Sequence, residues 1–97
     1  MANCYLTNLA VNDLAEIWEY TYEECSEKQA NKYYEQLLES CQELTNYPKF
    51  GKNYVLIQPD ILGFKTNHHI IFYRIISVKE IEIIRILHER MDLKSKL

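Results

Sequence analysis

Apolar residues recur at steps of three and four along the first half of the chain, which is the spacing of one face of an α-helix. They predict a first amphipathic helix over 9–24, after a short strand over 4–7, with Thr7 or Asn8 as the helix cap. Asp13 is assigned to the first turn of this helix, on its solvent side, where its charge would suit the helix dipole.

The second helix has the clearest pattern in the chain. Ser26 and Gln29 form a capping box at its start, and its apolar stripe continues as far as Leu44. It is expected to end before Pro48, because a proline disfavours helical angles in the residue that precedes it. Two amphipathic helices with so short a link form an antiparallel hairpin, which must bury its apolar stripes against another layer.

The second half of the chain predicts that layer, because its apolar segments are rich in β-branched residues. Two strands are expected at 54–58 and 61–66, and two longer strands at 69–76 and 81–88 form a hairpin. The order strand, helix, helix, strand, strand, strand indicates an α+β fold, with the helical hairpin packed on a three- to four-stranded, mainly antiparallel sheet. We expect one domain over 1–97.

Both faces of the long β-hairpin are largely apolar, whereas a half-exposed antiparallel sheet normally alternates. Without a bulge, the two strands pair symmetrically about the Val78–Lys79 bond, and His69 lies opposite His88. One face then carries Phe72, Arg74, Ile83 and Arg85, and the other carries Ile71, Tyr73, Ile75, Ile84 and Ile86. The helices can cover one face. The other is either an apolar patch that binds a partner chain or is covered by other parts of the same chain.

Composition narrows the classes of function. The 97 residues are 47% hydrophobic, as in a folded domain, and the formal net charge of −3 argues against non-specific nucleic-acid binding, although a local basic patch is compatible with it. Three cysteines without the spacing of a zinc site suggest reduced, buried thiols. No signal peptide or membrane span is recognisable, so we expect a cytoplasmic protein that does not contact membranes.

Several segments occur in the order found in one family. The segment 6–20 contains the pattern A-x-x-D-L-x-x-I-x-x-Y, and 44–51 contains the helix exit L-x-x-x-P-x-x-G. The segments 69–75 and 84–92 are the most specific. Together they resemble the RelE/ParE toxins of type II toxin–antitoxin systems over essentially the whole chain. The last segment is similar to the ParE branch, in which R-I-L-H-x-R-M-D closes the final strand.

One departure from the family concerns the third strand. Relatives often carry a basic residue two positions before its aromatic residue, and here that position, before Phe64, is occupied by Leu62. The substitution removes a charge from the sheet, which weakens any catalytic or nucleic-acid role for this strand.

The resemblance implies a toxin that inhibits DNA gyrase, is not itself a hydrolase and needs no cofactor. It also implies a ParD-like antitoxin, which would neutralise the toxin and make the contacts to operator DNA. The alternatives are a RelE-like, ribosome-dependent mRNA endonuclease and an inactive relative that only binds antitoxin. RNA cleavage requires cations and a general acid and base, for which the candidates are Arg74, Arg85 and His88.

The candidates for partner binding are aromatic, basic and sulfur-containing residues that could be exposed. They are Trp18, Tyr22, Tyr34, Phe64, Arg74, Arg85, His88, Arg90 and Met91. Each also has a structural interpretation. Arg74 could simply pair with Glu82 or Glu16, His69 and His88 could be hydrogen-bonded strand ends, and the aromatic residues could belong to the core and its margin. The tail 94–97 is expected to be a solvated end, or else the chain from Arg90 onward engages gyrase.

Overall fold

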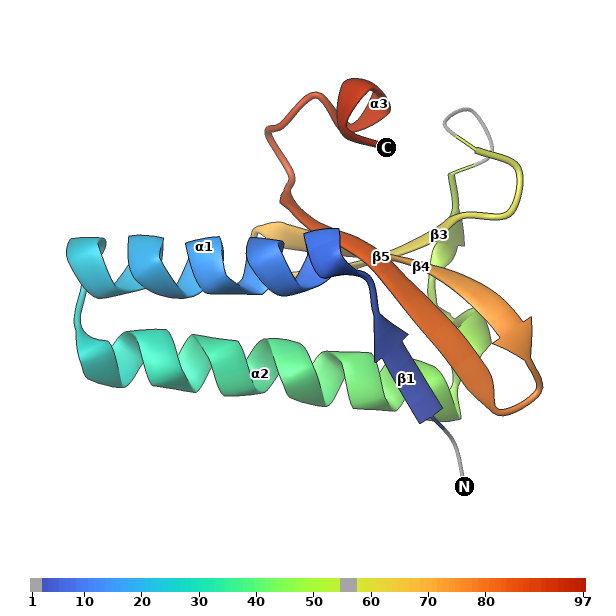
Figure 1. Cartoon of the computed structure of the whole chain (residues 1–97), viewed down its shortest axis with the longest axis horizontal. Coiled ribbons are helices and arrows are strands. Elements are labelled where there is room, and N and C mark those ends of the chain that lie inside the picture. Colours follow the sequence, from blue (N-terminus) through green and yellow to red (C-terminus); the bar gives the residue numbers. More distant parts are fainter. Residues whose placement is uncertain (1–2, 55–57) are drawn as a thin grey trace.

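A computed structural model describes residues 3–54 and 58–97. The predicted α+β fold is confirmed, with a helical hairpin packed on one mixed sheet (Figure 1). The elements in chain order are β1 (Asn3–Leu6), α1 (Asn8–Glu24), α2 (Glu27–Asn46), the 3-10 helix η1 (Pro48–Phe50), β2 (Lys52–Asn53), β3 (Leu62–Thr66), β4 (His69–Ser77), β5 (Glu80–His88) and α3 (Leu93–Lys96).

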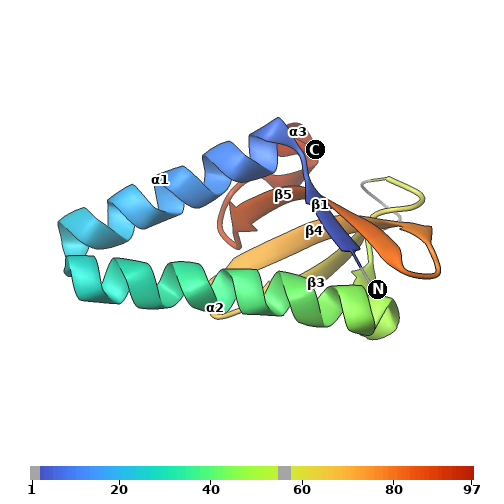
Figure 2. The ribbon, with the colours of Figure 1, turned by 60° about the horizontal axis from the view of Figure 1, so that its bottom comes forward.

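The sheet has the strand order β1-β5-β4-β3-β2, so the described residues form five strands where three or four were expected. The strand β1 runs parallel to β5, and the remaining neighbours are antiparallel. The strand expected at 54–58 falls mostly on 55–57, which lie outside the described residues. The two helices lie side by side against the sheet, as Figure 2 shows.

The helix caps follow local hydrogen bonding. The Ser26 hydroxyl accepts a hydrogen bond from the Gln29 amide at 3.1 Å, as the capping box predicted. The Thr7 hydroxyl accepts one from the Ala10 amide at 3.1 Å, so Thr7 is the cap of α1. The expectation for Asp13 was wrong, because a helix that begins at Asn8 places Asp13 beyond the first turn, where the residue is 6% exposed.

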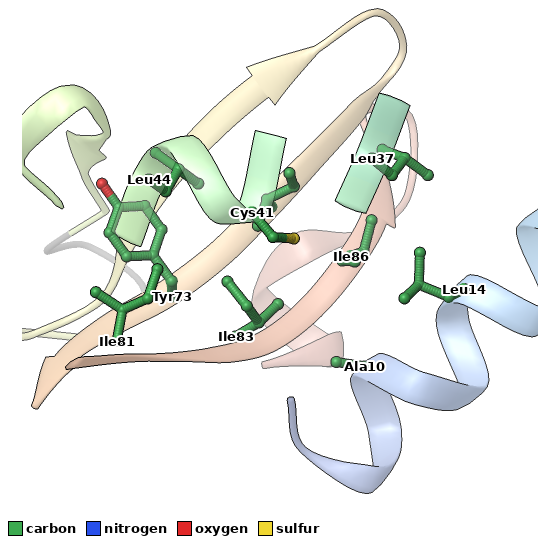
Figure 3. Close-up of a cluster of buried hydrophobic side chains, with 10 residues drawn as sticks. Ala10, Leu14, Leu37, Cys41, Leu44, Tyr73, Ile81, Ile83 and Ile86 are labelled. Carbon is green, nitrogen blue, oxygen red and sulfur yellow. The ribbon is translucent and has the colours of Figure 1, made fainter. Parts of the chain in front are cut away.

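The main core lies between the helices and one face of the sheet (Figure 3). The helices contribute small and branched side chains at helical spacing, and β4 and β5 contribute alternate residues. Its buried members are Ala10, Leu14, Leu37, Cys41, Leu44, Ile71, Tyr73, Ile81, Ile83 and Ile86. At one end of this core the Tyr73 hydroxyl donates to the Pro48 carbonyl at 2.6 Å and accepts from the Gly51 amide at 2.9 Å, which holds the exit from α2 against the sheet.

The bulge-free register was correct in the half of the hairpin remote from its turn and at the pair beside the turn, Ser77 with Glu80, but not between them. His69 pairs with His88 and Phe72 with Arg85, but Tyr73 pairs with Ile83, so Ile84 is the extra residue of a bulge. The bulge reverses the predicted faces of two neighbours: Ile83 joins the main core, and Ile84 turns to the opposite face. A second irregularity follows between Ile75 and Ser77.

The opposite face of the sheet carries a second core, which the chain covers by itself. Its buried residues are Ile61, Ile70, Phe72 and Leu87, and the side chains packed on them are Tyr54, Ile84, Leu93 and Leu97. The interpretation of this face as an open patch for a partner is therefore wrong at its centre. The prediction of a solvated tail was also wrong, because Leu93 and Leu97 pack on this second core. The C-terminal segment folds back over the sheet on the side away from α2 (Figure 1).

Candidate functional site

Arg85 is held by α1 and by the C-terminal segment. Its Nε and Nη2 each donate to one carboxylate oxygen of Asp13 at 2.8 Å, and its Nη1 donates to the Lys96 carbonyl at 3.2 Å. The hydrogen bonds that Arg85 donates to Asp13 are the main reason that the pKa of Arg85 is raised above its ordinary value. With only 16% of its side chain exposed, Arg85 is a structural cation rather than one free to meet a phosphate.

Arg74 is also engaged by carboxylates. Its Nε lies 2.7 Å from Oδ2 of Asp60, and its Nη1 lies 3.6 Å from Oε1 of Glu82. The pairing with Glu82 is therefore confirmed, whereas Asp60 was not anticipated. Arg74 and His88 belong to opposite halves of the hairpin, because His88 pairs with His69, five residues from Arg74 along β4. At about 3.3 Å per residue that separation is roughly 16 Å.

Three histidines meet at the end of the hairpin that is remote from its turn. The rings of His69 and His88 have centroids 5.3 Å apart, and His68 stacks beside His88 at 6.1 Å. The Tyr33 hydroxyl lies 2.6 Å from Nδ1 of His69. Burial, followed by the nearby His88 and His68, lowers the pKa of His69 from 6.5 to about 4, so this ring is neutral at physiological pH.

The outer side of this cluster is charged. Glu89 meets His68 Nδ1 at 2.9 Å and Lys65 Nζ at 3.0 Å, and hydrogen bonds from both lower the pKa of Glu89 from 4.5 to about 2. Nδ1 of His88 accepts from the Arg90 amide at 3.1 Å. The interpretation of His69 and His88 as hydrogen-bonded strand ends is confirmed.

A groove of about 380 Å³ runs between α1 and the end of β5. Its walls are mostly apolar, and its lining residues are Asp13, Glu16, Ile17, Tyr20, His69, Ile86, His88 and Met91. Met91 is 45% exposed, and the neighbouring Arg90 is exposed as well. Two of the predicted partner-binding residues, His88 and Met91, thus share one groove with Arg90 beside it. A larger hollow of about 690 Å³ beside α2 is lined by polar residues alone.

A second cluster lies on the helical hairpin. The rings of Trp18 and Tyr22 stack with centroids 5.2 Å apart, and the indole of Trp18 donates to Asn31 of α2 at 2.9 Å. Trp18 and Tyr34 also line a shallow hollow of about 340 Å³ between the helices. The structure therefore brings together the predicted residues Trp18, Tyr22 and Tyr34. Phe64 lies elsewhere, packed at the margin of the main core.

Charge divides the chain in two. The helices α1 and α2 carry nine of the fourteen acidic residues and only two of the eleven basic ones. The aromatic cluster therefore lies on an acidic layer, and the excess of basic residues lies in the half of the chain that forms most of the sheet.

The contacts of Asp13, whose carboxylate accepts three hydrogen bonds from β5, were not predicted from the sequence. Asp13 was assigned to the solvent side of α1, yet it joins α1 to β5. One signal was present in the sequence, because Asp13 stands three residues after Ala10 and four before Ile17, and both of these face the core. The contact between Tyr33 and His69 had no comparable signal, since it joins α2 to the start of β4.

In residues 3–54 and 58–97, three or more His, Cys, Asp or Glu side chains nowhere gather in a way that could hold a metal ion. Within the same ranges, every helix falls short of the length and apolar character needed to cross a bilayer.

Comparison with known proteins adds evidence of kinship. Residues 5–93 match the family described as ParE toxin of type II toxin-antitoxin system, parDE. The chain is 31% identical over 98 aligned residues to Toxin ParE1 of Mycobacterium tuberculosis, with both chains fully covered. It is 28% identical over 92 residues to Toxin ParE1 of Caulobacter vibrioides, covering 95% of this chain and 94% of the relative.

A solved structure described as the chromosomal ParDE TA system from P. aeruginosa has the same fold. It superposes with a TM-score of 0.76 at 21% identity, covering 91% of this chain and 96% of the other. The fold, the matched family and the relatives agree with the sequence motifs. The chain therefore belongs to the ParE branch of the RelE/ParE superfamily, the toxins of parDE type II toxin–antitoxin systems.

Proposed function

We propose that this ParE-type toxin inhibits DNA gyrase in the cytoplasm, without hydrolytic activity of its own, until a ParD-like antitoxin binds and neutralises it. Membership of the ParE branch supports the proposal, as does a groove and an aromatic cluster suited to protein contacts. Operator DNA is contacted by the antitoxin rather than by this chain, whose net charge is −3.

The placement of Arg74, Arg85 and His88 is the observation that argues against RNA cleavage. Both arginines are occupied by carboxylates, and His88 lies roughly 16 Å from Arg74 along the hairpin. Catalysis of phosphodiester cleavage requires the acid, the base and the cation to reach one scissile phosphate. These three residues do not form such a set in the folded chain.

The aromatic cluster on the helices is the surface we assign to the antitoxin. Tyr22 is 51% exposed and stacks on Trp18, which gives a rigid apolar platform that loses little side-chain entropy on binding. The surrounding acidic residues favour an amphipathic antitoxin segment with basic residues at its margins. Folding of that segment onto the platform would combine burial of apolar surface with charge pairing.

The groove beside His88 and Met91 is the surface we assign to gyrase. It is open, mostly apolar and separate from the platform, and Arg90 stands at its margin. Because the two surfaces are distinct, the antitoxin neutralises the toxin by covering more than the platform. It extends from the platform along α1 to the groove.

The deciding experiment measures two activities of the purified toxin. We expect inhibition of gyrase supercoiling with accumulation of cleaved DNA, while ribosome-bound mRNA stays intact. Cleaved mRNA with unaffected gyrase would overturn the proposal in favour of the endonuclease. No effect on either substrate, with tight antitoxin binding retained, would identify an inactive relative.

Antitoxin docking is tested with single substitutions. Tyr22→Ala should weaken binding of the cognate antitoxin by tenfold or more, as expected for an exposed aromatic anchor. Tyr47→Ala is a matched control, because Tyr47 is 57% exposed and stacks on Phe50, far along the chain from the platform. Calorimetry of each variant with the antitoxin gives the comparison. Equal affinities for the two variants would place the antitoxin elsewhere.

A further inference from the structure

Two of the three cysteines meet across the main core. Cys4 lies on β1 and is paired in register with Ile81, a residue of the core, so its side chain is on the helix side of the sheet. Cys41 projects from α2 into the same core, as Figure 3 shows, and is 1% exposed. Cys4 packs against the core cluster that contains Cys41, and each thiol shifts the pKa of the other. The strand β1 and the helix α2, far apart in the sequence, thus place two thiols in the same core.

The pKa values of the two thiols are shifted in opposite directions. The hydrogen bond from Cys41 lowers the pKa of Cys4 from 9.0 to about 7, with a smaller contribution from Thr45, against the opposing effect of burial. The same contact, with burial and the charge of the Cys4 thiolate, raises the pKa of Cys41 well above its ordinary value. Cys4 is the nucleophile of the pair, and because β1 is an edge strand and Cys4 is only half-buried, a small oxidant can reach it.

We propose that Cys4 and Cys41 form a peroxide-sensitive dithiol that closes into an intramolecular disulfide between β1 and α2. The role is separate from gyrase inhibition and from antitoxin binding. It requires no cofactor, since hydrogen peroxide or an alkyl hydroperoxide is the oxidant.

The first step is attack of the Cys4 thiolate on one peroxide oxygen. The O–O bond breaks, hydroxide leaves and takes up a proton as water, and Cys4 becomes a sulfenic acid. This removes the negative charge that opposed ionisation of Cys41. The Cys41 sulfur then attacks the Cys4 sulfur, the S–O bond breaks, and the hydroxyl group leaves as water with the Cys41 proton. Two thiols and one peroxide give one disulfide and two waters.

The bond would connect the first strand to the middle of α2, and the whole of α1 lies in the closed loop between them. Such a cross-link restricts the unfolded chain, so we expect the oxidised protein to melt at a higher temperature than the reduced protein. The helical layer and the edge of the sheet would then be joined covalently as well as by packing.

The test is peroxide treatment of the reduced, folded protein, followed by intact-mass measurement and a thiol count after denaturation. We expect the mass of the monomer to fall by two hydrogens, and one reactive thiol to remain of the three cysteines. Peptide mapping should link Cys4 to Cys41 and leave Cys25 free. The rate should rise with pH through about 7, the pKa of Cys4.

Cys25 provides the matched control, because it is an exposed cysteine that takes no part in the contact. Cys25→Ser should form the disulfide at the same rate, whereas Cys4→Ser and Cys41→Ser should each abolish it. Three remaining thiols after treatment, or oxidation confined to Cys25, would overturn the proposal. Because the decisive measurement uses the unmodified chain, a variant that fails to fold does not affect the conclusion.

Discussion

Asp13 of α1 and Arg85 of β5 form an ion pair through two parallel hydrogen bonds of 2.8 Å each. The same carboxylate accepts a hydrogen bond from the Ile86 amide at 3.0 Å. Because β1 pairs with β5 only as far as Ile83, Asp13 meets the edge of β5 just beyond the point where strand pairing ends. One side chain therefore neutralises a cation, satisfies a buried amide and attaches the helical layer to the sheet.

Asp13→Asn should destabilise the fold by about 2–4 kcal/mol, because the substitution leaves the largely buried Arg85 without a counter-charge. Urea unfolding monitored by circular dichroism measures the change. The matched control is Asp60→Asn, which breaks the more exposed pair with Arg74 and should cost less than about 1 kcal/mol. Similar losses for the two variants would show that burial does not set the strength of the Asp13 pair.

Tyr73→Phe should lower the free energy of unfolding by about 1–3 kcal/mol. The Tyr73 hydroxyl satisfies both the Pro48 carbonyl and the Gly51 amide, and phenylalanine leaves both groups without that partner. Tyr5→Phe serves as the control, since the Tyr5 hydroxyl donates to Glu80 at an exposed site, and its loss should leave the stability nearly unchanged. Thermal melts of both proteins, run with the parent, test the difference.

Stability should fall as the pH drops from 6.5 towards 4. The folded pKa of His69 is about 4, below its ordinary value of 6.5, so in this window the unfolded chain binds more protons than the folded one. Discounted for the partial exposure of the ring, the loss is about 1–2 kcal/mol. Urea titrations at several pH values measure it.

His69→Gln should flatten the pH dependence between 6.5 and 4. Glu89→Gln provides the contrast, because the Glu89 carboxyl has a folded pKa of about 2 against an ordinary 4.5, so its contribution is lost only as the pH falls through that lower window. A slope above pH 4.5 that persists in His69→Gln would assign the effect to another group.

Removal of residues 93–97 should destabilise the chain and increase its binding of a hydrophobic dye. Leu93 and Leu97 pack on the second core, and the Leu97 carbonyl accepts a hydrogen bond from the Gln58 amide group at 3.0 Å. Their loss exposes apolar surface at Phe72 and Leu87, at about 25 cal/mol per Å². Unchanged dye fluorescence and an unchanged urea midpoint would restore the interpretation of this tail as a solvated end.

Local patterns predicted the elements because each depends on neighbours in the sequence. The capping box at Ser26 and the proline at position 48 set the limits of α2 through contacts within a few residues. The α+β order and the membership of the ParE branch followed in the same way, since motifs such as R-I-L-H-x-R-M-D are contiguous. The antiparallel helical hairpin needed only the short link between two amphipathic stripes.

The predictions that failed depended on contacts between distant residues. The bulge at Ile84 moves a side chain to the other face without changing the apolar character of the strand, so periodicity could not reveal it. The two long helices cover only one face of the sheet, and the C-terminal tail covers the second core on the other face. This arrangement becomes apparent only when the sheet is assembled.

The sequence alone determined the elements, their order and the family, because helix and strand periods and contiguous motifs are local properties. The tertiary structure decided which charged groups are free. Asp13 is buried because β1 stops short along β5, and Arg85 is occupied because Asp13 is there. Whether a charged group is free depends on which residues folding places beside it. The tertiary structure separates the candidate catalytic residues and gathers Trp18, Tyr22 and Tyr34 on one acidic face.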